Sequence, residues 1–175
     1  ETMSGLTTTG STVMVGLDQL LPALNLWRHA LQWYGGMGII VLAIAILPLL
    51  GVGGMQLYRA EVPGVYKEKL TPRITDTAKS LWIVYAGITA ACIAALRLAG
   101  MSWFDAINHA FSAMSLGGYS THDASVGHFD SPAIEAVLIF FMIVAAMNFA
   151  SHFTAWREGS PRIYLADAEA RAVLL

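Results

Sequence analysis

The feature that most constrains this sequence is a glycine-rich stretch at 115–121 (Ser-Leu-Gly-Gly-Tyr-Ser-Thr), which lies between two long apolar runs. An amphipathic segment over 103–114 precedes it and is shorter than the roughly 20 residues that a spanning helix requires. Gly117 and Gly118 permit unusual backbone angles and a close approach of carbonyl groups to a ligand. Irregular backbone at membrane depth persists only where protein or a water-filled path satisfies its polar groups. The pattern therefore predicts a re-entrant pore loop, whose backbone carbonyls can replace the hydration shell of a cation.

The composition indicates a membrane protein. Of the 175 residues, 56% are hydrophobic and 13% are charged, and the mean hydropathy is +0.58, far above an average soluble domain. The formal net charge of -2 excludes a strongly basic nucleic-acid-binding surface. Cys92 is the only cysteine, which excludes a disulfide framework and a cysteine-rich metal site. Because the chain opens with Glu1 inside a motif, we interpret it as an interior piece of a larger membrane protein.

Three apolar runs have the length of membrane-spanning helices: roughly 26–50, 78–98 and 132–156. A connection over 17–24 precedes the first. Thr75 is expected to cap the second, and Ser131 with Pro132 suits the start of the third. Ser102 is expected to cap the short helix over 103–114. In the first run, aromatic residues are expected at the membrane interface (Trp27, Trp33 and Tyr34), and glycines are expected to permit close helix packing (Gly35, Gly36 and Gly38).

The loop charges predict an orientation. Most of the lysines and arginines lie in the loop over 58–79 and in the tail after residue 156. The loops that follow the glycine motifs carry acids instead: Asp18, Asp123 and Asp130. The positive-inside rule then places the basic segments in the cytoplasm and the glycine motifs at the outer mouth. The short helices would enter from outside with their partly negative C-terminal ends pointing inward, which favours a cation.

The same pattern occurs twice in the chain. Setting Gly10 against Gly118 aligns, at an offset of 108 residues, Ser4 with Ser112, Leu6 with Met114, Thr7 with Ser115, Ser11 with Tyr119 and Thr12 with Ser120. In both copies an acid (Asp18 or Asp130) and then a long apolar run follow. We therefore predict the back half of one helix–pore-loop–helix unit and all of the next. Two loops cannot encircle an ion, so further copies must come from sequence outside this chain or from other subunits.

Four motifs are spread over the chain: 4–10 (SGLTTTG), 32–40 (QWYGGMGII), 53–61 (GGMQLYRAE) and 117–125 (GGYSTHDAS). Together they resemble the TrkH/TrkG branch of the Trk/Ktr/HKT superfamily of bacterial potassium uptake proteins. The resemblance implies an all-α integral membrane protein of the bacterial inner membrane, with four helix–pore-loop–helix repeats around one central pore. It also implies a homodimer, a cytosolic nucleotide-binding regulatory subunit of the TrkA type, potassium as the transported ion, no other cofactor in this chain and no enzymatic activity.

The resemblance also implies a division of the chain. Residues 1–54 would hold the end of the first pore helix, its filter loop and the second spanning helix of repeat one. Residues 55–77 would form a cytoplasmic loop, 78–157 the complete second repeat, and 158–175 a cytoplasmic segment that leads to the next repeat. Repeats three and four, including the intramembrane loop that gates the family's pore, would lie outside this sequence.

Carried over residue by residue, the selectivity filter consists mainly of backbone carbonyls of Thr8, Thr9, Gly10 and Ser11 in the first loop and of Leu116, Gly117, Gly118 and Tyr119 in the second. Gly10 and Gly118 occupy the position where potassium-selective members carry glycine, and where serine accompanies sodium permeation in plant relatives. Only the second loop has the aromatic residue, so weak discrimination between potassium and sodium stays open. Basic residues of the cytoplasmic loop (Arg59, Lys67, Lys69 and Arg73) would contact either the regulatory subunit or lipid head groups.

Other polar residues have competing interpretations. In one outer loop, His122, Asp123, His128 and Asp130 match no zinc spacing, so a solvated polar loop is the favoured interpretation. Asn108, His109, Asn148, Ser151 and His152 are expected to form hydrogen bonds within the helical bundle. Ser120 or Ser151 with a histidine leaves an intramembrane serine hydrolase as the alternative function. An enzyme needs one asymmetric site whereas a pore needs equivalent loops, and the internal repeat favours the pore.

Overall fold

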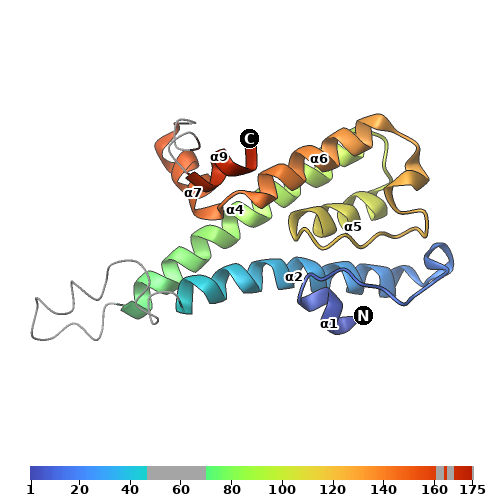
Figure 1. Cartoon of the computed structure of the whole chain (residues 1–175), viewed down its shortest axis with the longest axis horizontal. Helices are drawn as coiled ribbons and strands as arrows, with labels where there is room; N and C mark the ends of the chain where they lie inside the picture. Colours follow the sequence, from blue (N-terminus) through green and yellow to red (C-terminus); the bar gives the residue numbers. More distant parts are fainter. Residues whose placement is uncertain (47–69, 161–163, 165–167, 175) are drawn as a thin grey trace, which may run out of the picture.

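In the part of the chain that the structure describes, every regular element is a helix. The computed structural model describes residues 1–46, 70–160, 164 and 168–174. In chain order the elements are α1 (Thr2–Leu6), the 3₁₀ helix η1 (Leu17–Gln19), α2 (Pro22–Ile46), α4 (Leu70–Leu98), α5 (Trp103–Met114), the 3₁₀ helix η2 (Ser125–Phe129), α6 (Pro132–Ala146), α7 (Phe149–Glu158) and α9 (Ala168–Leu174) (Figure 1). The predicted all-α fold class is confirmed.

Helix α4 is the longest element, with 29 residues. At 1.5 Å per residue it is roughly 44 Å long, more than the roughly 30 Å of a bilayer's hydrocarbon core. Its segment Ala78–Leu98 is the one straight helix among the described residues that is long and apolar enough to cross a membrane. The helix begins at Leu70, earlier than predicted, so Thr75 lies inside it and is not its cap. Pro72 is compatible with the first turn, where backbone N–H groups have no helical partner.

Helix α2 also begins before its predicted start. Pro22 occupies its first position, where the fixed φ of proline is already helical. The connection predicted for 17–24 therefore ends at Leu21 and contains η1.

Two short helices lead into segments that turn back on themselves. Helix α5 runs from the end of the molecule that carries η2 toward its middle, and the chain after Met114 returns to that end (Figure 1). The chain after α1 likewise leads to the end where η1 lies. The bounds of α5 agree with the prediction because Ser102 caps it: its Oγ accepts a hydrogen bond from the backbone N–H of Asp105 at 3.1 Å.

The core surrounds α5, which packs against α2, α4 and α6. The buried side chains of α5 include the small residues Ala106, Ala110 and Ala113, which let the neighbouring helices approach. Trp33 of α2 stacks on Phe111 of α5 at 5.1 Å between ring centroids and donates a hydrogen bond to the hydroxyl of Thr89 in α4 at 3.1 Å. Trp33 thus joins three helices inside the bundle.

The last long helix is broken, contrary to the prediction of a continuous helix over 132–156. The segments Pro132–Ala146 and Ser151–Glu158 meet at an angle of 96°, and only as one broken span are they long and apolar enough to cross a membrane. His152 stabilises the break, since its Nε2 donates a hydrogen bond to the carbonyl of Val144 at 2.9 Å. Its Nδ1 bonds to the hydroxyl of Tyr164 at 3.0 Å. A side chain thus satisfies a carbonyl near the end of α6, as helix ends require.

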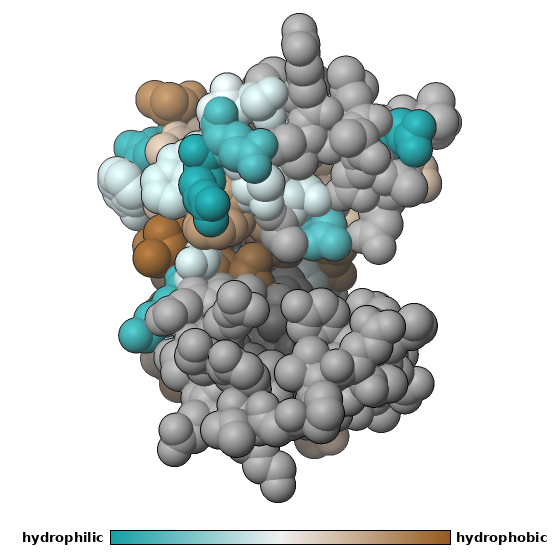
Figure 2. Space-filling model, turned by 90° about the vertical axis from the view of Figure 1, so that its left-hand side faces the viewer, coloured by the Kyte–Doolittle hydropathy of each residue, from teal (hydrophilic) through white to brown (hydrophobic). Residues whose placement is uncertain are grey.

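Helices α7 and α9 lie away from η1 and η2 (Figure 1). Arg157 in α7 and Arg171 in α9 are both exposed. Figure 2 shows the face on the left-hand side of Figure 1, where the coloured surface has hydrophilic residues beside hydrophobic ones.

The glycines of α2 differ in their surroundings. A Cβ added to Gly35 would lie 2.1 Å from the carbonyl oxygen of Leu6, and one added to Gly36 would lie 3.0 Å from the Cβ of Ser115. A Cβ added to Gly38 would meet no described atom within 4 Å. The close packing predicted for these glycines is confirmed at Gly35 and Gly36, where α2 touches the ends of α1 and α5.

We expect Gly35→Ala to lower the melting temperature and membrane abundance of the full-length protein, because the new methyl group overlaps the backbone of Leu6. Overpacking of this kind costs about 1–3 kcal/mol. Gly38→Ala is the matched control, and it should be neutral or stabilising because alanine favours helix over glycine by roughly 1 kcal/mol. Equal losses in the two variants would contradict the packing.

Candidate functional site

The two glycine loops have the same backbone geometry. Thr8 and Leu116 have φ of +55° and +54°, and Gly10 and Gly118 have φ of +73° and +79°. The backbone hydrogen bonds that end the preceding helices also correspond. In the first loop they join Thr7 N to Met3 O, Thr8 N to Gly5 O and Thr9 N to Ser4 O. In the second loop they join Ser115 N to Phe111 O, Leu116 N to Ala113 O and Gly117 N to Ser112 O. A positive φ costs a residue with a Cβ about 1–2 kcal/mol. The same costly geometry at an offset of 108 residues indicates a functional constraint on both loops.

The loops also touch each other. The hydroxyl of Tyr119 donates to the backbone carbonyl of Glu1 at 3.1 Å and of Ser11 at 3.4 Å. A Cβ added to Gly10 would lie 1.8 Å from the carbonyl oxygen of Gly117, so only glycine fits at position 10. A Cβ added to Gly118 would meet no described atom within 4 Å. The two glycines share a backbone conformation but differ in packing.

Gln32 lies behind both loops. Its side chain is fully buried, and its Oε1 accepts a hydrogen bond from the backbone N–H of Tyr119 at 3.4 Å. A Cβ added to Gly117 would lie 2.4 Å from the amide carbon of Gln32, and one added to Gly10 would lie 3.7 Å from its Nε2. The side-chain amide of Gln32 therefore lies close to both loops and forms its hydrogen bond with the second.

A buried ion pair ties α1 to α2 beside the loops. Nε of Arg28, a residue 2% exposed, pairs with the carboxylate of Glu1 at 2.9 Å. Its guanidinium lies 4.4 Å from the ring centroid of Tyr119. Burial raises the pKa of Glu1, but hydrogen bonds from Thr12 and Arg28 outweigh it and lower that pKa to about 2, so the carboxylate is charged at neutral pH. The pair connects the start of the first unit to the aromatic residue of the second loop.

The second loop is held against its own short helix. Nδ1 of His109 donates to the carbonyl of Asp105 at 2.9 Å, so its Nε2 accepts the hydroxyl proton of Ser120 at 3.0 Å. The hydroxyl of Thr121 donates to the carboxylate of Asp105 at 2.7 Å. The hydrogen bonding expected of His109 is thus present, and it orients the loop.

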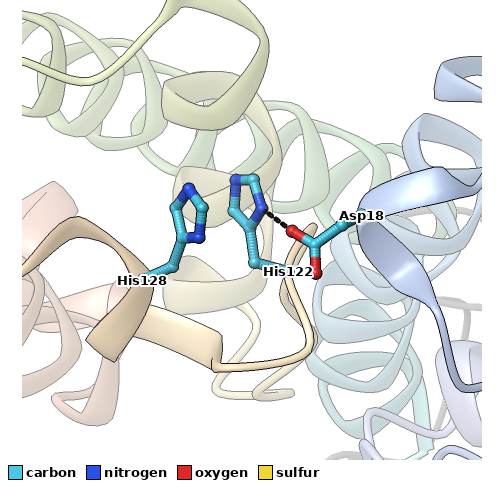
Figure 3. A group of neighbouring side chains, drawn as sticks. All are labelled: Asp18, His122 and His128. Carbon is cyan, nitrogen blue, oxygen red and sulfur yellow. Dashed lines mark hydrogen bonds and ion pairs between the residues drawn. The ribbon is translucent and has the colours of Figure 1, made fainter.

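The three acids expected at the outer mouth are all exposed, and two of them also form contacts: Asp18, Asp123 and Asp130. The carboxylate of Asp123 accepts the backbone N–H groups of Gly16 and Leu17, each at 3.1 Å. Asp18 bonds to Nδ1 of His122 (Figure 3), and that hydrogen bond lowers the pKa of Asp18. Asp130 is exposed at the end of η2. Asp18 and Asp123 therefore link the loops that follow the two glycine motifs.

Most loop carbonyls are free to bind a ligand. Among the described residues, nothing donates a hydrogen bond to the carbonyls of Thr8, Thr9, Gly10, Leu116, Gly117 and Gly118, whereas that of Ser11 accepts the Tyr119 hydroxyl. Thr8 and Leu116, at the inner ends of the loops, line a cavity of about 370 Å³ that reaches Asn148 at the α6–α7 break. The first residues of both loops therefore border the same cavity.

Of the four basic residues expected to contact a regulatory subunit or lipid head groups, the structure describes only one. Arg59, Lys67 and Lys69 lie outside the described residues. Arg73 lies near the start of α4.

Comparison with known proteins identifies the family. The family model named TrkH, a cation transport protein, matches residues 1–175. This chain belongs to the TrkH family. The Trk system potassium uptake protein TrkH of Halomonas elongata is 57% identical over 100% of this chain and 36% of its own length. TrkG of Escherichia coli K12 is 46% identical over 100% of this chain and 36% of its own length.

A solved structure of the TrkH family has the same fold. The crystal structure of the potassium transporter TrkH from Vibrio parahaemolyticus matches with a TM-score of 0.85 and 51% identity, over 98% of this chain and 34% of that one. The resemblance to the TrkH/TrkG branch is therefore confirmed. The chain spans about a third of the length of these TrkH-family relatives.

Sequence reasoning did not single out the polar residues of α2 that support the loops. Four polar side chains of this otherwise apolar helix are buried at positions i, i+3, i+4 and i+7: Asn25, Arg28, His29 and Gln32. That spacing places them on one face of α2, and polar residues at membrane depth indicate a functional region. The signal was therefore present, but it did not identify the partners of these residues.

We expect Glu1→Gln to lower the melting temperature of the full-length TrkH-family protein in detergent, because it leaves Arg28 buried without its counter-ion. Removal of one partner from a buried pair costs roughly 3–5 kcal/mol. Glu135→Gln is the matched control, since this carboxylate is exposed at the start of α6 and should change stability by less than about 0.5 kcal/mol. If both variants melt at the native temperature, the ion pair does not stabilise the fold.

Proposed function

We propose that this chain is part of a bacterial potassium uptake protein and that its two glycine loops supply two of the four filter loops around one pore. The observation that carries the proposal is the repeated left-handed backbone at Thr8 and Gly10 and at Leu116 and Gly118, with carbonyls that no described donor occupies. The names of the relatives, Trk system potassium uptake proteins, support the choice of ion. The filter would consist of the carbonyls of residues 8–11 and 116–119.

The backbone geometry suits a cation of low charge density. In a strand, successive groups point to opposite sides. Within each loop φ is positive at the first and third residues but not at the second, an alternation that can bring consecutive carbonyls to the same side. Potassium loses its hydration shell at lower cost than smaller cations, so a column of neutral dipoles can hold and release it. The partly negative C-terminal ends of α1 and α5, directly before the loops, add to the attraction.

We propose that the loops open to the outside of the bacterial inner membrane. The exposed Arg157 and Arg171 belong to α7 and α9, which lie away from η1 and η2 (Figure 1). The positive-inside rule assigns the side that carries α7 and α9 to the cytoplasm. Residues 1–54 and 78–157 then belong to two successive membrane repeats, with cytoplasmic segments at 55–77 and 158–175. Helix α4 would start inside the first of these segments.

The assembly extends beyond this chain. Two loops cannot enclose an ion, and the relatives are almost three times as long as the region that matches. We propose that repeats three and four of the full-length protein complete the pore, that two copies form a homodimer, and that a TrkA-type nucleotide-binding subunit docks on the cytoplasmic side. Arg59, Lys67, Lys69 and Arg73 are the proposed contact residues of this chain.

The outer acids would act on cations in two ways. Asp130 is exposed and can attract cations without selecting among them, an effect that is screened beyond roughly 8 Å at physiological ionic strength. Asp18 and Asp123 add negative charge at the same end, but they also hold the outer loops together. Their replacement would therefore affect loop structure as well as attraction.

The alternative of a serine hydrolase has one observation in its favour. The hydroxyl of Ser120 donates to Nε2 of His109 at 3.0 Å, which is the contact between a nucleophile and its base. Ser120 is only 6% and His109 only 3% exposed, however, so a substrate cannot reach the hydroxyl. We therefore assign the bond a structural role. A fluorophosphonate probe is expected to leave Ser120 unlabelled, whereas labelling that Ser120→Ala abolishes would favour the hydrolase.

We expect Gly118→Ser to lower potassium flux and to raise sodium influx at near-native membrane abundance. The positive φ costs serine about 1–2 kcal/mol, which is too little to unfold the protein. The described residues also leave space for the serine side chain. The added hydroxyl would compete with the carbonyls for the ion. The measurement is potassium-dependent growth and sodium influx in cells that lack other uptake systems, with abundance by immunoblot. Normal potassium uptake and unaltered sodium exclusion in a well-expressed variant would refute the filter assignment.

Gly10→Ser is the comparison variant. The sequence repeat treats positions 10 and 118 as equivalent, but a Cβ at position 10 would lie 1.8 Å from the carbonyl oxygen of Gly117. Gly10→Ser should therefore lower abundance in addition to selectivity.

A further inference from the structure

Three side chains from two distant parts of the chain meet at the outer end of the molecule. Asp18 comes from η1, His122 follows the second glycine loop, and His128 lies in η2 (Figure 3). One ligand-type atom from each residue lies within 4.8 Å of the other two. Within the second loop alone the spacing matches no zinc pattern. The third group, Asp18, is 104 residues away from His122 in sequence.

The two histidines are held together in a form that suits a metal. Their rings are stacked with 3.6 Å between centroids and 4° between planes, and Phe129 packs edge-on against both. The stack therefore places two imidazoles, a ligand type that zinc accepts, side by side.

The second ring nitrogen of His122 also lies near a carboxylate, that of Asp105. Its Nδ1 faces Asp18, while its Nε2 lies 3.4 Å from the carboxylate of Asp105. That Nε2 is buried and forms no hydrogen bond among the described residues. Asp105 is itself oriented by the hydroxyls of Ser102 and Thr121, at 2.6 and 2.7 Å. A histidine that binds a metal through one nitrogen commonly directs the other toward a carboxylate, as His122 can here.

We propose that Asp18, His122 and His128 form a binding site for a divalent transition metal of the zinc type. Two imidazoles and one carboxylate, with a fourth position open to water, are a ligand set that zinc accepts. Ligand atoms around a tetrahedral zinc ion lie roughly 3.3 Å apart. The wider separations in the cluster must therefore shorten, while the hydrogen-bonded pair of Asp18 and His122 must open to admit the ion. His128 and Asp18 are both exposed at the surface, which lets them make this movement. Calcium and magnesium, which prefer oxygen ligands, should bind poorly.

The site would join the two structural units. Asp18 belongs to the outer loop of the first unit, whereas His122 and His128 belong to that of the second. A bound ion would therefore lock the outer ends of the two glycine loops together, alongside the hydrogen bonds that Asp123 makes to Gly16 and Leu17. This binding does not depend on which ion the protein transports.

Isothermal titration of the purified full-length protein in detergent with zinc chloride tests the proposal. One zinc ion should bind per chain, and His128→Gln and Asp18→Asn should each weaken binding by at least about tenfold. Asp130→Asn, which removes a nearby exposed acid outside the cluster, should bind zinc as the native protein does. Excess calcium should not compete.

Melting curves of each variant establish that it is folded. His128 is exposed, so its replacement should leave the melting temperature unchanged without zinc. Native protein that binds no stoichiometric zinc, folded His128→Gln with native affinity, an equal loss in Asp130→Asn, or competition by calcium would each overturn the proposal. Since the readout is metal binding, a failure here would leave the proposed potassium transport untouched.

Discussion

One polar face of α2 supports both of the loops that we assign to the filter. Arg28 pairs with Glu1 and lies against Tyr119, Gln32 contacts both loops, and Gly35 leaves room for the end of α1. These residues are three or four positions apart, so they share one side of the helix. Irregular backbone within a membrane needs partners from the protein itself. The buried polar side chains of α2 provide them while leaving most loop carbonyls free for an ion.

The units are also joined to each other at several depths. Tyr119 bonds to the carbonyl of Ser11 near the middle, and Asp123 binds the backbone of Gly16 at the outer end. Below the loops, the break between α6 and α7 brings Asn148 to a cavity shared with Thr8 and Leu116. Because polar interactions are stronger where water is excluded, the partly buried contact of Tyr119 restricts the spacing of the loops more than the exposed contact of Asp123 does. Restricted spacing is what ion selection by fixed dipoles needs.

The elements that sequence predicts well are those with local signals. Ser102 and Asp105 set the start of α5, and the repeat of Gly10 at Gly118 anticipates two loops with the same φ values. The sequence does not predict contacts between distant residues, such as that of Asp18 with His122, because no local pattern indicates which residues meet. The break after Ala146 was also missed, since the run is apolar throughout and its stabilising partner, His152, follows the break. The potassium filter itself is inferred from the family resemblance and from unoccupied carbonyls.

The most direct test of the central claim is the position of the ion itself. A crystal structure of the full-length protein with thallium or rubidium in place of potassium would locate the ion by its anomalous scattering. We predict anomalous peaks on the pore axis, within coordinating distance of the carbonyls of residues 8–11 and 116–119, and weakened peaks in Gly118→Ser. Peaks confined to the outer acids, with none beside Gly10 and Gly118, would contradict the account.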